Sequence, residues 1–334
     1  MTTFLTPRQL ARRTSAAVDA AVAAGRELGL TVTDPTVLHD LFSVVVHLAP
    51  SPVVARIPTV LPRPDDLAAL ARRQQDELEV TRWLADQGVP VIAPSPLVPR
   101  EPVRRDGFSM TFWPFVPEDR DKEPDYVANA ESVADLHAAM RAYPGHLEFL
   151  AAADPRFIAE SLARLDRHPT LIGAAELDRA RREWQVLQPL VRSRTAFETR
   201  FPGIGLQPIH GDSPPANIFS GVDGNLYADF ELVTLGPVEW DLASLGPEHE
   251  SAYNRGARRN GTRPLDEEVL GFVNALGMLR VVASLTLVPQ LPQLMEYLEP
   301  AVDRWLMNGQ DDLDVRVQGP GWPSSSTRGR SGPP

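Results

Sequence analysis

The chain has 334 residues, a formal net charge of −11 and no cysteine. The missing cysteines exclude disulfides, thiolate catalysis and cysteine-bound zinc, and they make a cytoplasmic location the simplest expectation. The acidic balance without a basic patch disfavours a nucleic-acid partner, and the lack of a run of about twenty apolar residues predicts no membrane span.

The first part of the chain predicts a small lobe rich in strands. A helix is expected over residues 6–28. Three apolar runs follow, which we interpret as strands with a hairpin turn between the last two, at 36–41, 42–48 and 53–57. A second helix is expected over residues 64–87, ended by Gly88 and Pro90, and two more strands at 89–92 and 108–116.

The second part predicts a larger and mainly helical lobe. Residues 117–124 are rich in proline and charge, which is typical of a connector. Helices are expected over residues 126–197, with two inward stripes marked by Val133, Leu136 and Met140 and by Phe157, Leu162 and Leu165. Short strands follow, and helices resume over residues 266–307. The composition from residue 319 onward predicts a disordered tail.

Polar side chains follow the short apolar runs near residue 220. They are Asp212, Asn217, Asp229 and Glu231, and the ends of short strands can aim them at a common point. No lysine or arginine occurs from residue 201 to 254, so a divalent cation is a natural counter-charge for these acids. The set suits magnesium and a triphosphate, with one carboxylate facing an attacking hydroxyl.

These residues lie in motifs that resemble the aminoglycoside phosphotransferase family of small-molecule kinases, which is similar in fold to protein kinases. The motifs are His210-Gly211-Asp212 with Asn217 five residues later, Asp229-Phe230-Glu231, and the run over residues 236–243. The resemblance covers about residues 30–305. It implies an α+β, two-lobed, protein-kinase-like fold with a small β-rich N-lobe and a larger, mainly helical C-lobe.

The resemblance also divides the chain into parts. We expect a leading helical segment, a nucleotide-binding N-lobe, a catalytic and substrate-binding C-lobe and a disordered tail, over residues 1–30, 31–117, 118–318 and 319–334.

Within the C-lobe, Asp212 is the expected catalytic base, because a carboxylate near the acceptor hydroxyl can orient it and take its proton. Asn217 and Asp229 are the expected magnesium ligands. Glu231 lies on the same face as Asp229 in an extended segment, where it reaches a second metal or a coordinated water. The alternatives are a turn-capping role for Asp212 and a plain loop role for Asn217.

Two further residues of the motifs are expected to support the catalytic loop. The resemblance implies that His210 holds the loop through hydrogen bonds and that Asp241 steadies its backbone. A metal role for His210 is disfavoured, because no second histidine or cysteine lies at ligand spacing.

In the N-lobe, the resemblance places a basic strand residue on the nucleotide phosphates, paired with a helix glutamate. Arg56 and Glu77 occupy those positions, and the alternative for Arg56 is a strand-surface charge. Relatives often have lysine at the strand position, and arginine brings a flatter, wider head. The loop over the phosphates is expected at residues 38–43, where there is no glycine and Ser43 with nearby amides would have to suffice.

The predicted function is an ATP-dependent phosphotransferase, with GTP as the alternative donor and magnesium as cofactor, acting on a small-molecule hydroxyl. A P-loop nucleotidase is excluded, because Lys122 is the only lysine and lies in a polar loop. The alternative from another class is a nucleotide-binding pseudokinase. A protein kinase is less favoured, because ten positions from Asp229 to Glu239 leave no room for a long activation loop.

The acceptor stays open between an aminoglycoside and another small metabolite or antibiotic. An aminoglycoside pocket needs several carboxylates for its ammonium groups. The candidates in the last helices, for which solvation is the better interpretation, are Asp266, Glu267, Glu268, Glu296 and Glu299. The sequence does not indicate an oligomeric state.

Overall fold

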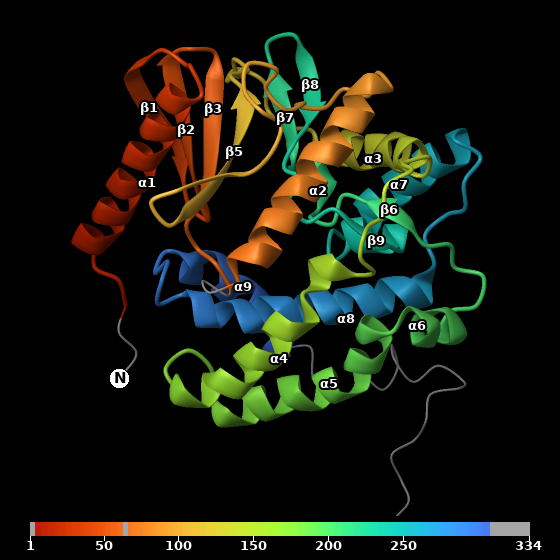
Figure 1. Ribbon diagram of the computed structural model, residues 1–334. Helices are drawn as coiled ribbons and strands as arrows, with labels where there is room; N and C mark the ends of the chain where they lie inside the picture. The colour runs from red at the N-terminus through yellow and green to blue at the C-terminus, as the bar shows by residue number, and fades with distance from the viewer. Residues whose placement is uncertain (1–3, 63–65, 308–334) are drawn as a thin grey trace, which may run out of the picture.

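The computed structural model describes residues 4–62 and 66–307. The expected disordered tail, over residues 319–334, lies outside the described residues. The structure has a sheet-containing N-lobe and a mainly helical C-lobe, which confirms the predicted fold class (Figure 1).

The N-lobe is built on an antiparallel five-stranded sheet in the order β1-β2-β3-β5-β4. Its strands are β1 Val32–Asp40, β2 Ser43–Pro50, β3 Val53–Pro58, β4 Val103–Arg105 and β5 Phe108–Pro114. The hairpin expected between the second and third runs is present as the β2–β3 turn. Successive side chains of a strand face opposite sides of the sheet. In β3 this places Val53, Ala55 and Ile57 in the apolar core and Val54 and Arg56 on the other face.

Helix α1, Pro7–Glu27, packs against the core face of this sheet (Figure 1). Its buried side chains are small, which lets the helix approach the strands closely, and they are Ala17, Ala20, Ala21 and Ala24. Thr6 begins the helix through a capping box with Gln9. The start of α1 also contacts the C-lobe, since Leu5 N donates to Pro289 O at 2.8 Å and Arg13 Nη1 donates to Gln290 O at 3.1 Å.

Helix α2, Leu67–Asp86, lies on the opposite side of the sheet and carries the buried Glu77. Asp66 caps its first turn by accepting a hydrogen bond from Ala69 N. The helix therefore brings a carboxylate to the face of β3 that carries Arg56.

The C-lobe packs its helices around one large apolar cluster. The helices are α3 Tyr126–Met140, α4 Pro155–Arg164, α5 Ala174–Arg192, α6 Arg194–Arg200, α7 Pro247–Arg259, α8 Glu267–Ser284 and α9 Leu294–Met307. Both predicted inward stripes, on α3 and on α4 with the turn after it, are buried. Short 3₁₀ turns join the helices at Ala151–Ala153, Leu165–Arg167, Pro214–Ala216, Val238–Leu242 and Leu285–Leu287.

Two small antiparallel ribbons carry the motif segments between α6 and α7. One pairs β6 Gln207–Ile209 with β9 Thr234–Gly236, and the other pairs β7 Ile218–Gly221 with β8 Gly224–Tyr227. Each ribbon has only two strands, so the ribbons depend on packing against helices for their stability.

One strand prediction was wrong, and one strand of the sheet was not predicted. Residues 89–92 form no strand of the sheet, and Val91 makes a single parallel bridge with Tyr227 of β8. Strand β4 was missed, because its sequence Val-Arg-Arg shows no apolar alternation. The edge position of β4 explains why its charged residues are tolerated.

Helix α8 is the most apolar helix of the C-lobe. The stretch Glu267–Leu287 is long and apolar enough to cross a membrane by length and composition alone, a property that the sequence interpretation did not flag. Half of that window is buried inside the protein, where α8 packs against α4, α5 and α9. Its apolar character is that of a core helix.

We expect Gly256→Ala in α7 to destabilise the protein by about 1–3 kcal/mol. A Cβ at this position would overlap the carbonyl oxygen of Glu131 in α3, where the two helices pack closely. Gly277→Ala in α8 is the matched control, because its Cβ meets nothing within 4 Å and should stabilise the helix by about 0.5–1 kcal/mol. Urea unfolding of both variants checks this, and equal effects would contradict the close packing.

Candidate active site

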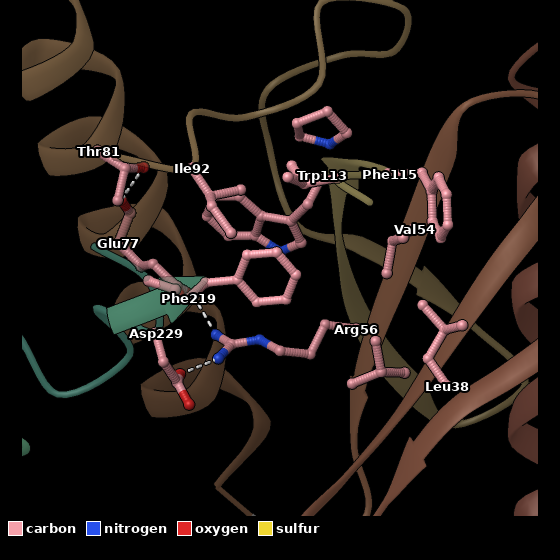
Figure 2. A pocket seen from close by; sticks show the side chains of 14 residues that line it. Leu38, Val54, Arg56, Glu77, Thr81, Ile92, Trp113, Phe115, Phe219 and Asp229 are labelled. Carbon is pink, nitrogen blue, oxygen red and sulfur yellow. Dashed lines mark hydrogen bonds and ion pairs between the residues drawn. The ribbon is translucent and has the colours of Figure 1, made fainter. Parts of the chain in front are cut away.

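An apolar cavity of about 280 Å³ lies between the N-lobe sheet and the β7–β8 ribbon (Figure 2). Apolar side chains dominate its wall, and charged groups gather at one end. The lining residues are Leu38, Val45, Val54, Arg56, Glu77, Thr81, Ile92, Trp113, Pro114, Phe115, Val116, Phe219, Ala228 and Asp229. This shape fits a flat ring in the apolar part and phosphates at the charged end.

Arg56 forms the charged end of this cavity. It makes ion pairs with Glu77 of α2 and with Asp229, which follows β8 (Figure 2). Its Nη1 also lies 3.4 Å from Glu231 Oε2. Burial raises the pKa of Glu77, and contact with Arg56 opposes that rise. One guanidinium therefore joins an N-lobe helix to the two acidic residues of the second motif.

The loop after β6 is held by one buried carboxylate. Asp241 is fully buried and accepts hydrogen bonds from His210 N at 2.9 Å and from Gly211 N at 2.7 Å. Its Oδ2 also lies 2.8 Å from His137 Nε2 of α3. Two backbone amides and one histidine thus fix the path of the chain just before Asp212.

Gly211 allows this close packing. Its φ is +89°, and a Cβ would overlap the carbonyl oxygen of Leu232. Trp240 Nε1 donates to the Gly211 carbonyl at 2.8 Å. Any larger residue would have to move the loop away from this contact.

His210 links the loop to the segment after β8. Its Nε2 lies 2.8 Å from Ala228 O, and Asp212 N donates to its Nδ1 at 3.3 Å. The neutral tautomer with the proton on Nε2 satisfies both contacts. These contacts bring Asp212 close to Asp229 in space, although seventeen residues separate them in the chain.

A second cavity of about 270 Å³ lies on the other side of Arg56. Asp212 and Glu231 line it, together with two arginines that the sequence analysis did not name, Arg73 of α2 and Arg280 of α8. Burial raises the pKa of Asp212, and the nearby Arg280 opposes the rise. A base with a raised pKa, beside a cavity, suits proton removal from a bound hydroxyl.

Of the predicted metal ligands, Asp229 lines the apolar cavity and Glu231 lines the second one, while Asn217 lines neither. The Asp229 and Glu231 side chains are 42% and 38% exposed, so both remain open to a ligand. Partial burial and repulsion from Asp229 raise the pKa of Glu231 to about 7. Asn217 Nδ2 donates to Asp212 O at 2.5 Å, so its side-chain oxygen is the atom that suits a cation.

No three histidine, aspartate or glutamate side chains in residues 4–62 and 66–307 are grouped closely enough to hold a metal. Two carboxylates and one amide nevertheless fit magnesium, because this ion keeps phosphate oxygens and waters in its shell. Binding a cation at Asp229 would require Arg56 to give up part of its contact there.

The glycine-free loop lies over both cavities. Leu38 near the end of β1 lines the apolar cavity, and Phe42 and Ser43 line the second one. Ser43 thus lies on the side of Asp212, while the predicted role of its loop on phosphates stays a prediction.

The sequence analysis missed several residues that hold the site. His137, Arg73 and Arg280 lie on helices far from the motifs, and only periodicity marked those helices. Glu239 appeared without a counter-charge, yet Arg263 Nη1 and Nη2 donate to its carboxylate at 2.5 and 2.9 Å. A charged residue on an otherwise apolar helix, as Arg280 is on α8, was the available signal.

Comparison with known proteins identifies one family model, the phosphotransferase enzyme family, which matches residues 44–282. No curated protein matches the chain by sequence.

Similar solved structures include the amicoumacin kinase hAmiN in complex with AMP-PNP, Ca²⁺ and Ami, at 16% identity and a TM-score of 0.58, covering 92% of this chain and 96% of that one. Aminoglycoside phosphotransferase APH(3'')-Id from Streptomyces rimosus has 19% identity, a TM-score of 0.52 and coverage of 79% and 97%. Choline kinase LicA from Streptococcus pneumoniae has 14% identity, a TM-score of 0.52 and coverage of 90% and 99%. At these identities the likeness shows the fold.

We expect Asp241→Asn to lower the free energy of unfolding by about 2–5 kcal/mol, because the amide turns an N–H toward a buried donor. Urea unfolding measures this loss. Asp166→Asn is the matched control, since it breaks an exposed ion pair with Arg181 and should leave the free energy of unfolding nearly unchanged. Equal, small losses in both variants would show that Asp241 does not hold the loop.

Proposed function

The chain belongs to the phosphotransferase enzyme family, and we propose that it transfers the γ-phosphoryl group of ATP to a hydroxyl of a small molecule with Asp212 as the base. The observation that carries this proposal is the meeting of two cavities at one acidic junction. Asp229 lines the apolar cavity, Asp212 and Glu231 line the second, and Arg56 lines both.

The apolar cavity suits the nucleotide. Aliphatic side chains of the sheet and Phe219 of β7 would enclose the base, and Arg56 would meet the phosphates. An arginine in two ion pairs presents its remaining N–H groups in a fixed direction, which favours phosphate oxygens. Either ATP or GTP fits this general description, so the donor test uses both.

The second cavity suits the acceptor. A hydroxyl beside Asp212 would attack the γ-phosphorus, the bond to the bridging oxygen of the leaving nucleoside diphosphate would break, and the hydroxyl proton would pass to the Asp212 carboxylate. Asp241 and His210 position Asp212 through the backbone and do not themselves touch the substrate.

Magnesium, when bound by Asn217 and Asp229 with Glu231 close by, would neutralise phosphate charge. The contribution of the chain itself is to hold these three oxygen-bearing side chains and Asp212 on two neighbouring loops. Catalysis in this reaction class depends mainly on such positioning and charge stabilisation.

We expect Asp212→Asn to lower kcat by roughly 10²–10⁴-fold while ATP still binds. The assay is magnesium-dependent conversion of ATP or GTP to the diphosphate, with mass analysis of products from aminoglycosides, macrolides, choline and sugars. Asp223→Asn removes the same charge from the exposed β7–β8 turn and should leave kcat unchanged. Unchanged transfer by Asp212→Asn would reject Asp212 as the base, and nucleotide binding without any product would favour a pseudokinase.

We expect Arg56→Gln to raise KM for ATP by roughly 10- to 100-fold, the equivalent of one or two charge-assisted hydrogen bonds to phosphate. Arg56→Lys should recover part of this loss, because it keeps the charge but cannot span Glu77 and Asp229 together. Steady-state kinetics with varied ATP measure both. An unchanged KM in a folded Arg56→Gln protein would remove Arg56 from the phosphate site.

A further inference from the structure

The charges that line the acceptor cavity are equal in number but unevenly paired. Three carboxylates and three arginines face it, namely Asp154, Asp212, Glu231, Arg56, Arg73 and Arg280. Asp154 accepts from Arg73 Nη2 at 2.8 Å and also caps α4 by accepting from Phe157 N. Glu231 lies 3.4 Å from Arg56. Asp212 is the base of the proposed function and Glu231 lies beside its metal site, so each carboxylate of this cavity already has a partner or a role.

Arg280 is the arginine of this cavity that has no ion-pair partner among the described residues. Within residues 4–62 and 66–307 it makes no side-chain hydrogen bond or ion pair, and its guanidinium carbon lies 6.0 Å from the centroid of the Trp240 ring. Burial lowers its pKa, and Asp212, Asp154 and Glu231 oppose that effect from a distance. A confined guanidinium without a hydrogen-bonded partner is costly, and a bound anion would offset the cost.

Arg280 and Arg73 line one cavity with Asp212. Arg73 is paired with Asp154, so Arg280 is the arginine of this wall that has no ion-pair partner among the described residues. The rest of the wall is mainly apolar, with Phe42, Val60, Phe157 and Leu287 among its members. A volume of about 270 Å³ is small for a ligand pocket, since the usual range begins at roughly 300 Å³.

We infer that the acceptor is a small hydroxy compound that carries an anionic group, a carboxylate or a phosphate, which Arg280 binds while the hydroxyl meets Asp212. The inference rests on the proposed function and narrows its substrate class. It disfavours a polycationic acceptor in this cavity. The acids considered for ammonium binding, Asp266, Glu267, Glu268, Glu296 and Glu299, do not line it.

A neighbouring cavity of about 440 Å³ shares Arg73, Asp154 and Glu231 with this one. It carries charges of both signs, including Asp76, Glu148, Arg72 and Arg156. Because its charges are mixed, this cavity gives no preference for a polycation, and the unpaired Arg280 remains the feature that selects the acceptor.

The test uses pairs of acceptors that share a carbon skeleton and differ in charge. The carboxylate arm compares 4-hydroxybutyrate with 4-hydroxybutyramide, the phosphate arm compares glycerol 3-phosphate with glycerol, and kanamycin is the cationic probe. Turnover with magnesium and ATP is followed by product mass. In at least one arm, we expect kcat/KM for the anion to exceed that for its neutral partner by roughly 10- to 100-fold. The arm that shows this difference in kcat/KM tells whether the anionic group is a carboxylate or a phosphate.

Three variants locate the effect. Arg280→Gln should remove the preference by raising KM for the anion, with KM for ATP unchanged, and Arg280→Lys should keep part of it. Arg304→Gln removes the same charge from an exposed position of α9 and should change neither constant. An equal loss of kcat for the anion and its neutral partner would place Arg280 on the transferring phosphoryl group and overturn the inference.

Binding separates this inference from the proposed function. The same probes are titrated by calorimetry into Asp212→Asn loaded with AMP-PNP and magnesium, so no turnover is needed. Arg280-dependent binding of an anion that the unmutated protein does not phosphorylate would support the anion-binding role of Arg280 and count against the proposed function. Phosphorylation of kanamycin or a neutral partner in preference to the anions, or no anion binding at all, would overturn the inference.

Discussion

The fully buried Asp241 carboxylate is the contact on which the arrangement of the site depends. It accepts hydrogen bonds from the backbone amides of His210 and Gly211 and lies within hydrogen-bond distance of the His137 ring, so it joins the loop after β6 to helix α3. His137 in turn lies 2.9 Å from the Tyr253 hydroxyl of α7. A buried acid is tolerated only when such partners satisfy it. The position of Asp212 is therefore set by the packing of the helical core.

Much of the fold could be predicted from the sequence because its signals are local. The leading helix, the β2–β3 hairpin and the buried stripes of α3 and α4 follow from periodicity and turn residues. Strand β4 and the single bridge at Val91 could not be predicted, since both depend on a neighbouring strand that only the tertiary structure brings close. The sequence motifs also indicated Asp212, Asn217, Asp229 and Glu231 as candidate site residues, because these residues lie close together along the chain.

The counter-charges could not be predicted, because they come from distant segments. The stretch over residues 201–254 has no lysine or arginine, and we expected a cation to balance its acids. In the structure, Arg56 of the N-lobe forms an ion pair with Asp229, and Arg263 forms one with Glu239. Arg280 lies near Asp212. Each lies 24 or more residues away from its partner in the chain, beyond the reach of any local pattern. Protein cations from distant segments therefore supply part of the charge that we had expected from a bound cation.

The contact of α1 with the C-lobe has a consequence for motion between the lobes. The chain crosses between the lobes at residues 117–124, and the hydrogen bonds of Leu5 and Arg13 to residues 289 and 290 add a contact far from that crossing in the sequence. The ion pairs of Arg56 with Asp229 and of Arg73 with Asp154 also bridge the lobes. A jaw-like opening of the lobes would therefore require the start of α1 to detach from the C-lobe, in addition to the loss of these ion pairs.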